Sequence, residues 1–238
     1  VSKAAAMAEV VRQSEAELGP VEVCIAAAGA STPKYFEDLV ESDFMHMLNV
    51  NYLGVVHLAK AVLPGMVSRG EGQFAAVCSM AAAVPFIGYA AYAPTKAACR
   101  TFVDVLRNEY ADTPIQFHVA FPPDTDTPGF AKENESKPYE TSHIWPEMFN
   151  ETFPAKDVAK RIVDGLLAGD YFLSSPDLFG NLLVSRAWGH FPRAAPLFEA
   201  AIAPIFVGLH GVMVWMADRA VKGRAHHAAA LPKTKATG

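Results

Sequence analysis

Cysteine is scarce in this sequence. Its 238 residues include three cysteines, Cys24, Cys78 and Cys99, an odd number without the spacing of metal-ligand motifs. Cys24 and Cys78 lie in apolar, strand-like runs and Cys99 in a helical one. This pattern disfavours a disulfide scaffold and predicts no metal site. We expect three buried free thiols in a reducing compartment.

Charge is also limited. Charged residues make up 19% of the chain, the net charge is −5, and the body of the chain contains no long basic run. These features argue against nucleic acid as the main partner. The start of the chain lacks the pattern of a secretory signal peptide.

A third missing feature is a glycine-rich phosphate turn. No Gly-x-x-x-Gly-x-Gly segment occurs anywhere in the sequence. Such a turn, followed by a helix N-terminus, grips the phosphates in dinucleotide-binding folds. The first residue is Val1 rather than Met, and a helical pattern with Ser2 as its N-cap begins at once, so we expect further residues upstream.

What is present is an alternation of helical and fully apolar segments. Helices are expected over 2–18, 43–68, 92–110 and 154–168, and buried strands over 21–26, 73–79 and 115–121. Pro64 is expected to end or bend the second helix. The alternation predicts an α/β fold with a doubly wound, Rossmann-like parallel sheet covered on both faces. Residues 122–154 have no clear periodicity and contain six prolines, which is typical of a loop that covers an active site.

Tyr92 and Lys96 lie four residues apart at the start of a predicted helix, and therefore on one face of it. An ammonium near a phenol stabilises the phenolate and lowers its pKa, which suits acid–base work. Ser79 ends the preceding strand, where ligands bind in parallel sheets. Taken singly, the tyrosine and lysine could be a helix-surface pair and the serine a turn or cap residue.

Asn51 lies within the second predicted helix, in the segment Asn49-Val50-Asn51-Tyr52-Leu53-Gly54. Asparagine is a mediocre helix former, so two within three residues need a reason. A break in the backbone with a bound water would be one. A helix-surface amide is the alternative, which suits Asn49 better than Asn51.

Together, Asn51, Ser79, Tyr92 and Lys96 resemble, in order and spacing, the catalytic tetrad of the short-chain dehydrogenase/reductase family. The resemblance extends from residue 1 to about residue 170. It implies that Tyr92 is the general acid in carbonyl reduction, that Lys96 lowers its pKa and holds the nicotinamide ribose, that Ser79 orients the carbonyl, and that Asn51 anchors a water. It also implies a cofactor-binding surface made of Ala28, Gly29, Asn51, Tyr92, Lys96, Pro122, Thr125 and Thr127, with Thr127 at the nicotinamide carboxamide.

The sequence departs from the family pattern in three places. Ala26 and Ala27 replace two asparagines beside the adenosine, and Pro94 replaces a common serine. Proline is tolerated in a first helical turn. The third departure is the missing phosphate turn, which the family carries before the first segment matched here. We therefore expect this chain to be a fragment of a complete enzyme and to bind NADPH weakly by itself.

The loop Pro122-Pro123-Asp124-Thr125-Asp126-Thr127-Pro128-Gly129-Phe130 is more specific. It resembles the signature of the family's reductases of long-chain 3-keto sphingoid bases, and Glu133-Asn134 and Lys137-Pro138 continue the match. The resemblance implies NADPH-dependent reduction in sphingolipid synthesis, at the endoplasmic reticulum membrane with the active site facing the cytosol. Two alternatives stay open: a reductase of a steroid or retinoid carbonyl, and a non-catalytic interaction module.

The C-terminal region divides from the rest. We expect a catalytic domain over 1–176 and a helical, membrane-associating segment with a basic tail over 177–238. Residues 200–217 contain one strongly polar side chain, His210, and basic residues follow them. The alternative is a buried helix that closes the substrate pocket or forms a homo-oligomer interface.

Overall fold

The computed structural model describes residues 1–84, 86–143 and 151–177, together with positions 181, 204, 205, 208 and 212. Its main sheet is parallel, with the strand order β1 (Val23–Ala26), β2 (Gln73–Val77), β3 (Gln116–Ala120) and β6 (Phe172–Leu173). Two short strands, β4 (Thr125–Asp126) and β5 (Phe153–Pro154), pair beside it. β1, β2 and β3 fall within the apolar runs of the sequence. β2 and β3 are buried on both faces, as such runs predict, whereas β1 alternates, with Val23 and Ile25 exposed.

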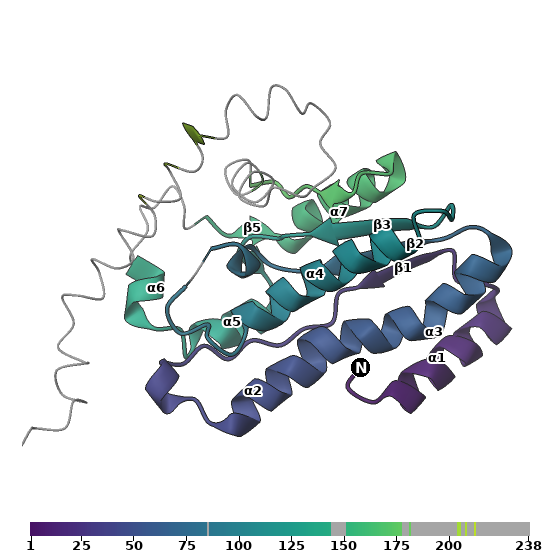
Figure 1. Cartoon of the computed structure of the whole chain (residues 1–238). Helices are drawn as coiled ribbons and strands as arrows, with labels where there is room; N and C mark the ends of the chain where they lie inside the picture. The colour runs from purple at the N-terminus through teal and green to yellow at the C-terminus, as the bar shows by residue number, and fades with distance from the viewer. Residues whose placement is uncertain are drawn as a thin grey trace, which may run out of the picture.

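Helices cover the sheet on both faces (Figure 1). α1 (Ala4–Leu18) packs on α3 (Gly54–Arg69), and α3 and α4 (Ala93–Glu109) pack on one face, where Phe74, Ala76, Phe117 and Val119 join the larger core. α7 (Ala155–Ala168) lies on the other face, where Val158, Ile162 and Leu166 contact Ala75 and Ala120. The predicted α/β fold with helices on both faces is therefore confirmed.

The crossover that contains α7 has an unusual hand. The strand order runs steadily from β1 to β6, whereas the helix changes face after β3. The connection β3–α7–β6 therefore has the opposite hand to the two crossovers before it. Nearly all parallel crossovers are right-handed, so the last segment departs from that rule.

The helix ends differ from the sequence expectation in two places. The helix expected to end or bend at Pro64 does not end there but continues to Arg69. Pro64 is exposed, while Val62, Leu63 and Met66 are buried in the core. At the N-terminus, helix α1 begins after Lys3, not Ser2, and no side chain caps it.

The stretch 122–154 contains more regular structure than predicted. α5 (Pro128–Asn134) and α6 (Tyr139–His143) lie within it, in addition to β4 and β5. Thr127 caps α5 by accepting a hydrogen bond from the Phe130 backbone N–H at 3.1 Å. Helices this short show no readable periodicity, which is why the sequence pattern missed them.

Before α3, the chain forms a continuous helical stretch from α2 (Glu41–Met47) through a π-helical turn, η2 (Leu48–Leu53). By length and composition the stretch Glu41–Arg69 could cross a membrane, since it contains an 18-residue window with a mean hydropathy of 1.3. Its apolar side chains also have a clear role in the core, since Val55, Ala59 and Leu63 are buried there. The predicted membrane-associating segment over 177–238 lies almost wholly outside the described residues.

Candidate active site

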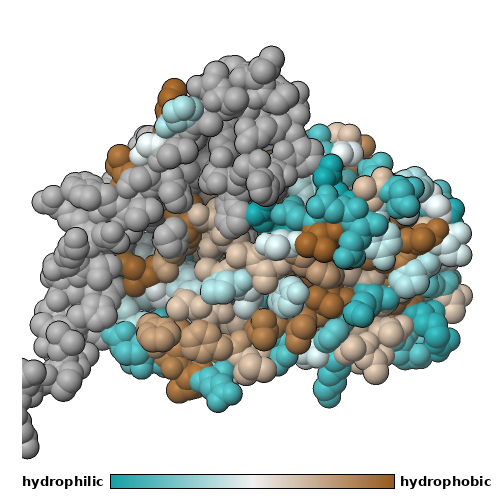
Figure 2. All heavy atoms as spheres, viewed as in Figure 1, coloured by the Kyte–Doolittle hydropathy of each residue, from teal (hydrophilic) through white to brown (hydrophobic). Residues whose placement is uncertain are grey.

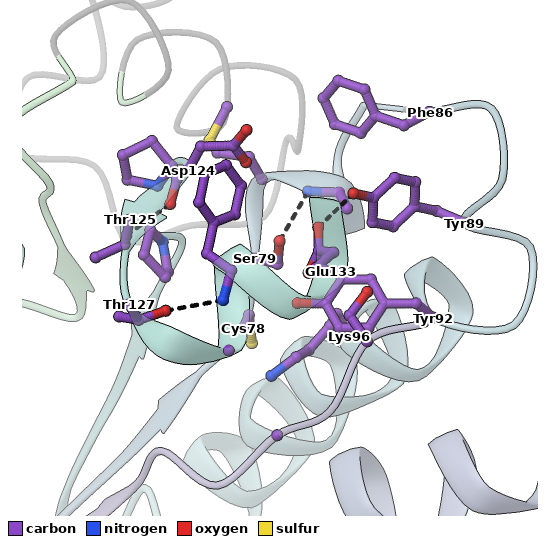
Figure 3. Close-up of a pocket in the computed structure, with 18 of the residues that line it drawn as sticks. Cys78, Ser79, Phe86, Tyr89, Tyr92, Lys96, Asp124, Thr125, Thr127 and Glu133 are labelled. Carbon is purple, nitrogen blue, oxygen red and sulfur yellow. Dashed lines mark hydrogen bonds between the residues drawn. The ribbon is translucent and has the colours of Figure 1, made fainter. Parts of the chain in front are cut away.

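A cavity of about 620 Å³ opens at the carboxyl ends of the main strands. Gly29 follows β1, Ser79 follows β2 and Pro122 follows β3, and all three line it. The residues of α5 close another side (Figure 3). This volume lies in the ordinary range for small-molecule sites, and the position is the one at which ligands bind in parallel α/β sheets.

Ser79, Tyr92 and Lys96 meet in this cavity (Figure 3). Ser79 caps a short 3-10 helix, η3 (Met80–Ala82), by accepting a hydrogen bond from the Ala81 N–H at 3.1 Å. Tyr92 is the N-cap residue of α4, and Pro94 lies in the first turn of that helix, where proline fits. The sequence thus placed these three residues together correctly.

The pKa of Tyr92 is raised, whereas the sequence led us to expect that Lys96 lowers it. Burial raises the pKa of Tyr92 above its ordinary value, and the nearby Glu133 carboxylate raises it further. A side-chain hydrogen bond with Ser79 lowers the pKa, but by less than burial raises it. The Tyr92 phenol is therefore protonated at neutral pH, as a proton donor must be.

Lys96 is buried, with 4% of its surface exposed. Its ammonium donates a hydrogen bond to the Val77 carbonyl at 2.9 Å, and it lies 5.8 Å from the centre of the Tyr92 ring. Burial lowers the pKa of Lys96. Gly29 explains how the lysine fits, because a Cβ at that position would lie 3.3 Å from Nζ.

Asn51 lies beneath the cavity and does not line it. Its side chain is fully buried in the π-helical turn. Its amide accepts a hydrogen bond from the Ala30 N–H at 2.8 Å and donates to the Ala30 carbonyl at 3.0 Å and to Thr95 Oγ1 at 3.1 Å. The Cys99 thiol donates to the Asn51 carbonyl at 3.0 Å. The backbone around Asn51 is irregular, as predicted, because the helix is π-helical there. The Asn51 side chain lies at this turn and holds the loop after β1.

The other residues predicted to bind a cofactor divide into two groups. Gly29, Pro122, Thr125 and Thr127 line the cavity, whereas Ala28 is exposed and does not. The Thr125 hydroxyl donates to the Pro123 carbonyl at 2.8 Å. Thr127 uses its hydroxyl to cap α5, so its oxygen already has one partner.

Sequence reasoning missed a second pair in the cavity, Tyr89 and Glu133. The Tyr89 hydroxyl donates a hydrogen bond to the Glu133 carboxylate. The rings of Tyr89 and Tyr92 meet edge to face, with centres 5.7 Å apart. In the sequence, Glu133 stands out only as part of the match that continues the loop after Pro122, and nothing there indicates that it meets Tyr89.

The three cysteines are free and buried, as predicted. Burial raises the pKa of Cys24 to about 12 and that of Cys99 to about 11. Such thiols are poor nucleophiles at neutral pH, so none of the three is suited to attack a substrate.

The cavity fits the nicotinamide end of a dinucleotide. Ala27, Gly29 and Ala30 make one wall of small residues, next to the buried Lys96 ammonium. The Ser31 hydroxyl lines the same wall and, among the described residues, has no hydrogen-bond partner although it is buried. A buried hydroxyl of this kind is available to a polar ligand.

Comparisons with known proteins agree with this geometry. Residues 1–138 match the family described as short chain dehydrogenase. The chain is 40% identical over 183 residues to a 3-ketodihydrosphingosine reductase of Bos taurus, covering 77% of this chain and 54% of the relative. It is 39% identical over 184 residues to a 3-dehydrosphinganine reductase of Danio rerio, with the same coverage. The chain spans about half the length of these curated relatives.

A solved structure with the same fold is an alcohol dehydrogenase from the archaeon Thermococcus sibiricus complexed with 5-hydroxy-NADP. It is 29% identical, with a TM-score of 0.58, and the match covers 70% of this chain and 65% of that one. A gluconate 5-dehydrogenase from Burkholderia cenocepacia in complex with NADP and tartrate is 25% identical with a TM-score of 0.52, covering 53% and 49%.

Proposed function

Because the chain belongs to the short-chain dehydrogenase family, we propose that it provides the catalytic residues of an NADPH-dependent reductase. The substrate is the 3-keto group of 3-ketodihydrosphingosine, and the product is dihydrosphingosine. The meeting of Ser79, Tyr92 and Lys96 in one cavity carries the proposal. The relatives that are 37–40% identical and bear this activity in their names support the choice of substrate.

Ser79 and Tyr92 have separate roles in the reduction of the carbonyl. The Ser79 hydroxyl and the Tyr92 phenol both hydrogen-bond the substrate carbonyl oxygen, which places it for reaction. The Tyr92 phenol then gives its proton to that oxygen as the carbonyl carbon becomes a carbinol. The hydride for the carbonyl carbon comes from NADPH when it is bound. Oxygen gains the proton and carbon the hydride, so the product is an alcohol and Tyr92 is left to be reprotonated.

Lys96 and Asn51 act on Tyr92 and the cofactor more than on the substrate. A buried ammonium on the same helix face stabilises the phenolate that forms after proton transfer, and it would also hold a ribose hydroxyl of the cofactor. Asn51 holds the backbone of Ala30, which forms part of the nicotinamide wall. The part of the cavity proposed to hold the nicotinamide also includes Gly29, Pro122, Thr125 and Thr127.

We propose NADPH rather than NADH as the cofactor. Two similar solved structures, one complexed with 5-hydroxy-NADP and one with NADP, support this choice. Calorimetric titration of the full-length protein with NADPH and NADH tests this preference.

We also assign the protein to the endoplasmic reticulum membrane, with its active site on the cytosolic side. The substrate has a long hydrocarbon chain and is drawn from a bilayer. Residues 177–238 include an apolar run with basic residues after it, which suits association with an anionic membrane surface. Fractionation of cells expressing forms with and without residues 197–238 tests this assignment. If high salt alone releases the protein from membranes, the basic tail is the anchor. If the protein is fully soluble, the assignment to the membrane is wrong.

The test of the activity is Tyr92→Phe in the full-length protein, which keeps the ring and removes the proton donor. Turnover of 3-ketodihydrosphingosine should fall about 10²- to 10⁴-fold, the usual contribution of a general acid. NADPH binding should be unchanged. Tyr110→Phe, at the other end of α4, is the matched control and should retain turnover. Retention of more than about a tenth of wild-type turnover by Tyr92→Phe would contradict the assigned role.

A further inference from the structure

Glu133 places a carboxylate beside the proposed proton donor. It is half-buried on α5, lines the cavity and accepts a hydrogen bond from Tyr89, whose ring meets that of Tyr92 (Figure 3). Its negative charge raises the pKa of Tyr92 and so acts on the reacting hydroxyl. For proton transfer from Tyr92, a lone carboxylate at this place is a disadvantage, because it opposes formation of the phenolate.

The cavity contains other carboxylates, but their settings differ. Asp124 forms an ion pair with Lys137, with a nitrogen–oxygen distance of 3.3 Å, and its side chain is half exposed. Glu151 and Asp177 also line the cavity. Of these four groups, Glu133 is the one whose charge acts on Tyr92. Within the described part of the chain, Glu133 forms no ion pair, and its hydrogen-bond partner is a neutral phenol.

The proposed substrate carries the complementary charge at the matching place. In 3-ketodihydrosphingosine, the carbon next to the carbonyl bears an amino group, which is protonated as an ammonium. With the carbonyl oxygen on Tyr92 and Ser79, the ammonium is one carbon away from the reacting centre. Glu133 lines the same cavity and bonds Tyr89, whose ring packs against Tyr92, so its carboxylate is placed to meet this ammonium.

We propose that Glu133 binds the substrate ammonium and makes the site selective for ketones with an amino group on the adjacent carbon. This inference rests on the proposed function. The Tyr89 hydroxyl is a positioning group that holds the carboxylate toward the cavity. Once the ammonium is bound, its positive charge offsets the negative charge of Glu133 at Tyr92. The Tyr92 phenolate then forms more readily, which favours reduction of the amino ketone.

The test compares two substrates of equal chain length in the full-length enzyme. One is 3-ketodihydrosphingosine, and the other is the 1-hydroxy-3-ketone that lacks the amino group. Glu133→Gln keeps the shape of the side chain and can still accept the hydrogen bond from Tyr89. It should lower kcat/KM for the amino ketone roughly 10- to 100-fold, the range expected for loss of a charge-assisted hydrogen bond. For the deamino ketone, kcat/KM should change less than about 3-fold or rise, because no charge-assisted bond is lost there.

Two further variants sharpen the result. Glu135→Gln changes an exposed carboxylate just beyond α5 and should affect neither substrate. Tyr89→Phe should affect the amino ketone more than the deamino ketone, because it frees Glu133 without removing its charge. NADPH affinity, measured by titration, should stay at the wild-type value in all three variants.

The outcomes separate the inference from the proposed function. Equal losses for both substrates in Glu133→Gln would make Glu133 a structural residue and overturn the inference alone. No loss for either substrate would do the same. If Glu133→Gln does not fold, the wild-type enzyme decides, because it should itself prefer the amino ketone by about 10-fold or more. Failure of the wild-type enzyme to reduce either ketone would overturn the proposed function and the inference with it.

Discussion

Replacement of Asn51 by alanine should destabilise the protein strongly. The Asn51 side chain is fully buried and bonds both backbone groups of Ala30, at 2.8 and 3.0 Å. Alanine would leave the Ala30 N–H and carbonyl without these partners, whereas Thr95 keeps its bond to the Tyr92 carbonyl at 2.6 Å. An unsatisfied group that is fully buried costs about 1–3 kcal/mol; because Ala30 is half-buried and lines the cavity, the two groups together cost about 2 to at most 6 kcal/mol. That is a large part of the 5–15 kcal/mol by which a typical domain is stable.

The assay is urea unfolding of the wild type and of Asn51→Ala, followed by far-UV circular dichroism. Asn49→Ala is the matched control, because Asn49 lies in the same π-helical turn but is only half-buried. The control should lose less than about 1 kcal/mol, as most substitutions without a buried network do. If the two variants differ by less than about 1 kcal/mol, the buried hydrogen bonds of Asn51 do not hold the loop after β1, and the reasoning is refuted.

Two other perturbations test the same region and the far side of the sheet. Gly29→Ala places a Cβ 3.3 Å from Lys96 Nζ and should cost about 1–3 kcal/mol in urea unfolding and most of the turnover. Gly129→Ala, whose Cβ would meet Thr127 Oγ1 at 3.8 Å and no nearer atom of the described residues, should be tolerated in the same unfolding assay. Burial lowers the pKa of His118, so the unfolded state binds the proton more readily, and stability should fall as pH drops below about 6.5. His118→Gln should lose part of this pH dependence in urea unfolding at pH 7.5 and 5.5, and an unchanged dependence would exclude His118 as its source.

Burial lowers the pKa of His118 by more than the hydrogen bond to the Asp170 carbonyl raises it. Nδ1 lies 2.7 Å from the Asp170 carbonyl, which can only accept, so Nδ1 carries the hydrogen. Nε2 is buried and, within the described residues, has no partner. Protonation would add a buried N–H without an acceptor, which is why the folded state resists it.

Much of the fold could be predicted because its signals are local. The runs around Phe74 and Phe117 are apolar at successive positions, which is typical of strands covered on both faces. The placement of Tyr92 and Lys96 on one face of α4 follows from the helical repeat alone. Ser79 could be placed because a residue at the end of a parallel strand lies at the ligand-binding edge.

The features that escaped prediction depend on contacts distant in sequence. Glu133 meets Tyr89 across 44 residues, and no pattern within either segment indicates that meeting. The buried position of Asn51 depends on Ala30, 21 residues earlier, and on Thr95, 44 residues later. The continuation of the helix past Pro64 depends on the burial of Leu63 and Met66 against the rest of the core, which overrides the local preference to stop.

The hydrogen bonds of the site join four parts of the fold into one network. Asn51 ties the end of β1 to the π-helical turn, the Cys99 thiol ties that turn to α4, and Lys96 ties α4 to the Val77 carbonyl at the end of β2. Changes within this network should therefore reduce stability and turnover together. Removal of the hydroxyl of Ser79 or Tyr92, at the cavity surface, should reduce turnover with much smaller effects on stability. We expect this comparison to separate residues that build the site from residues that carry out its chemistry, with Asn51 among the former.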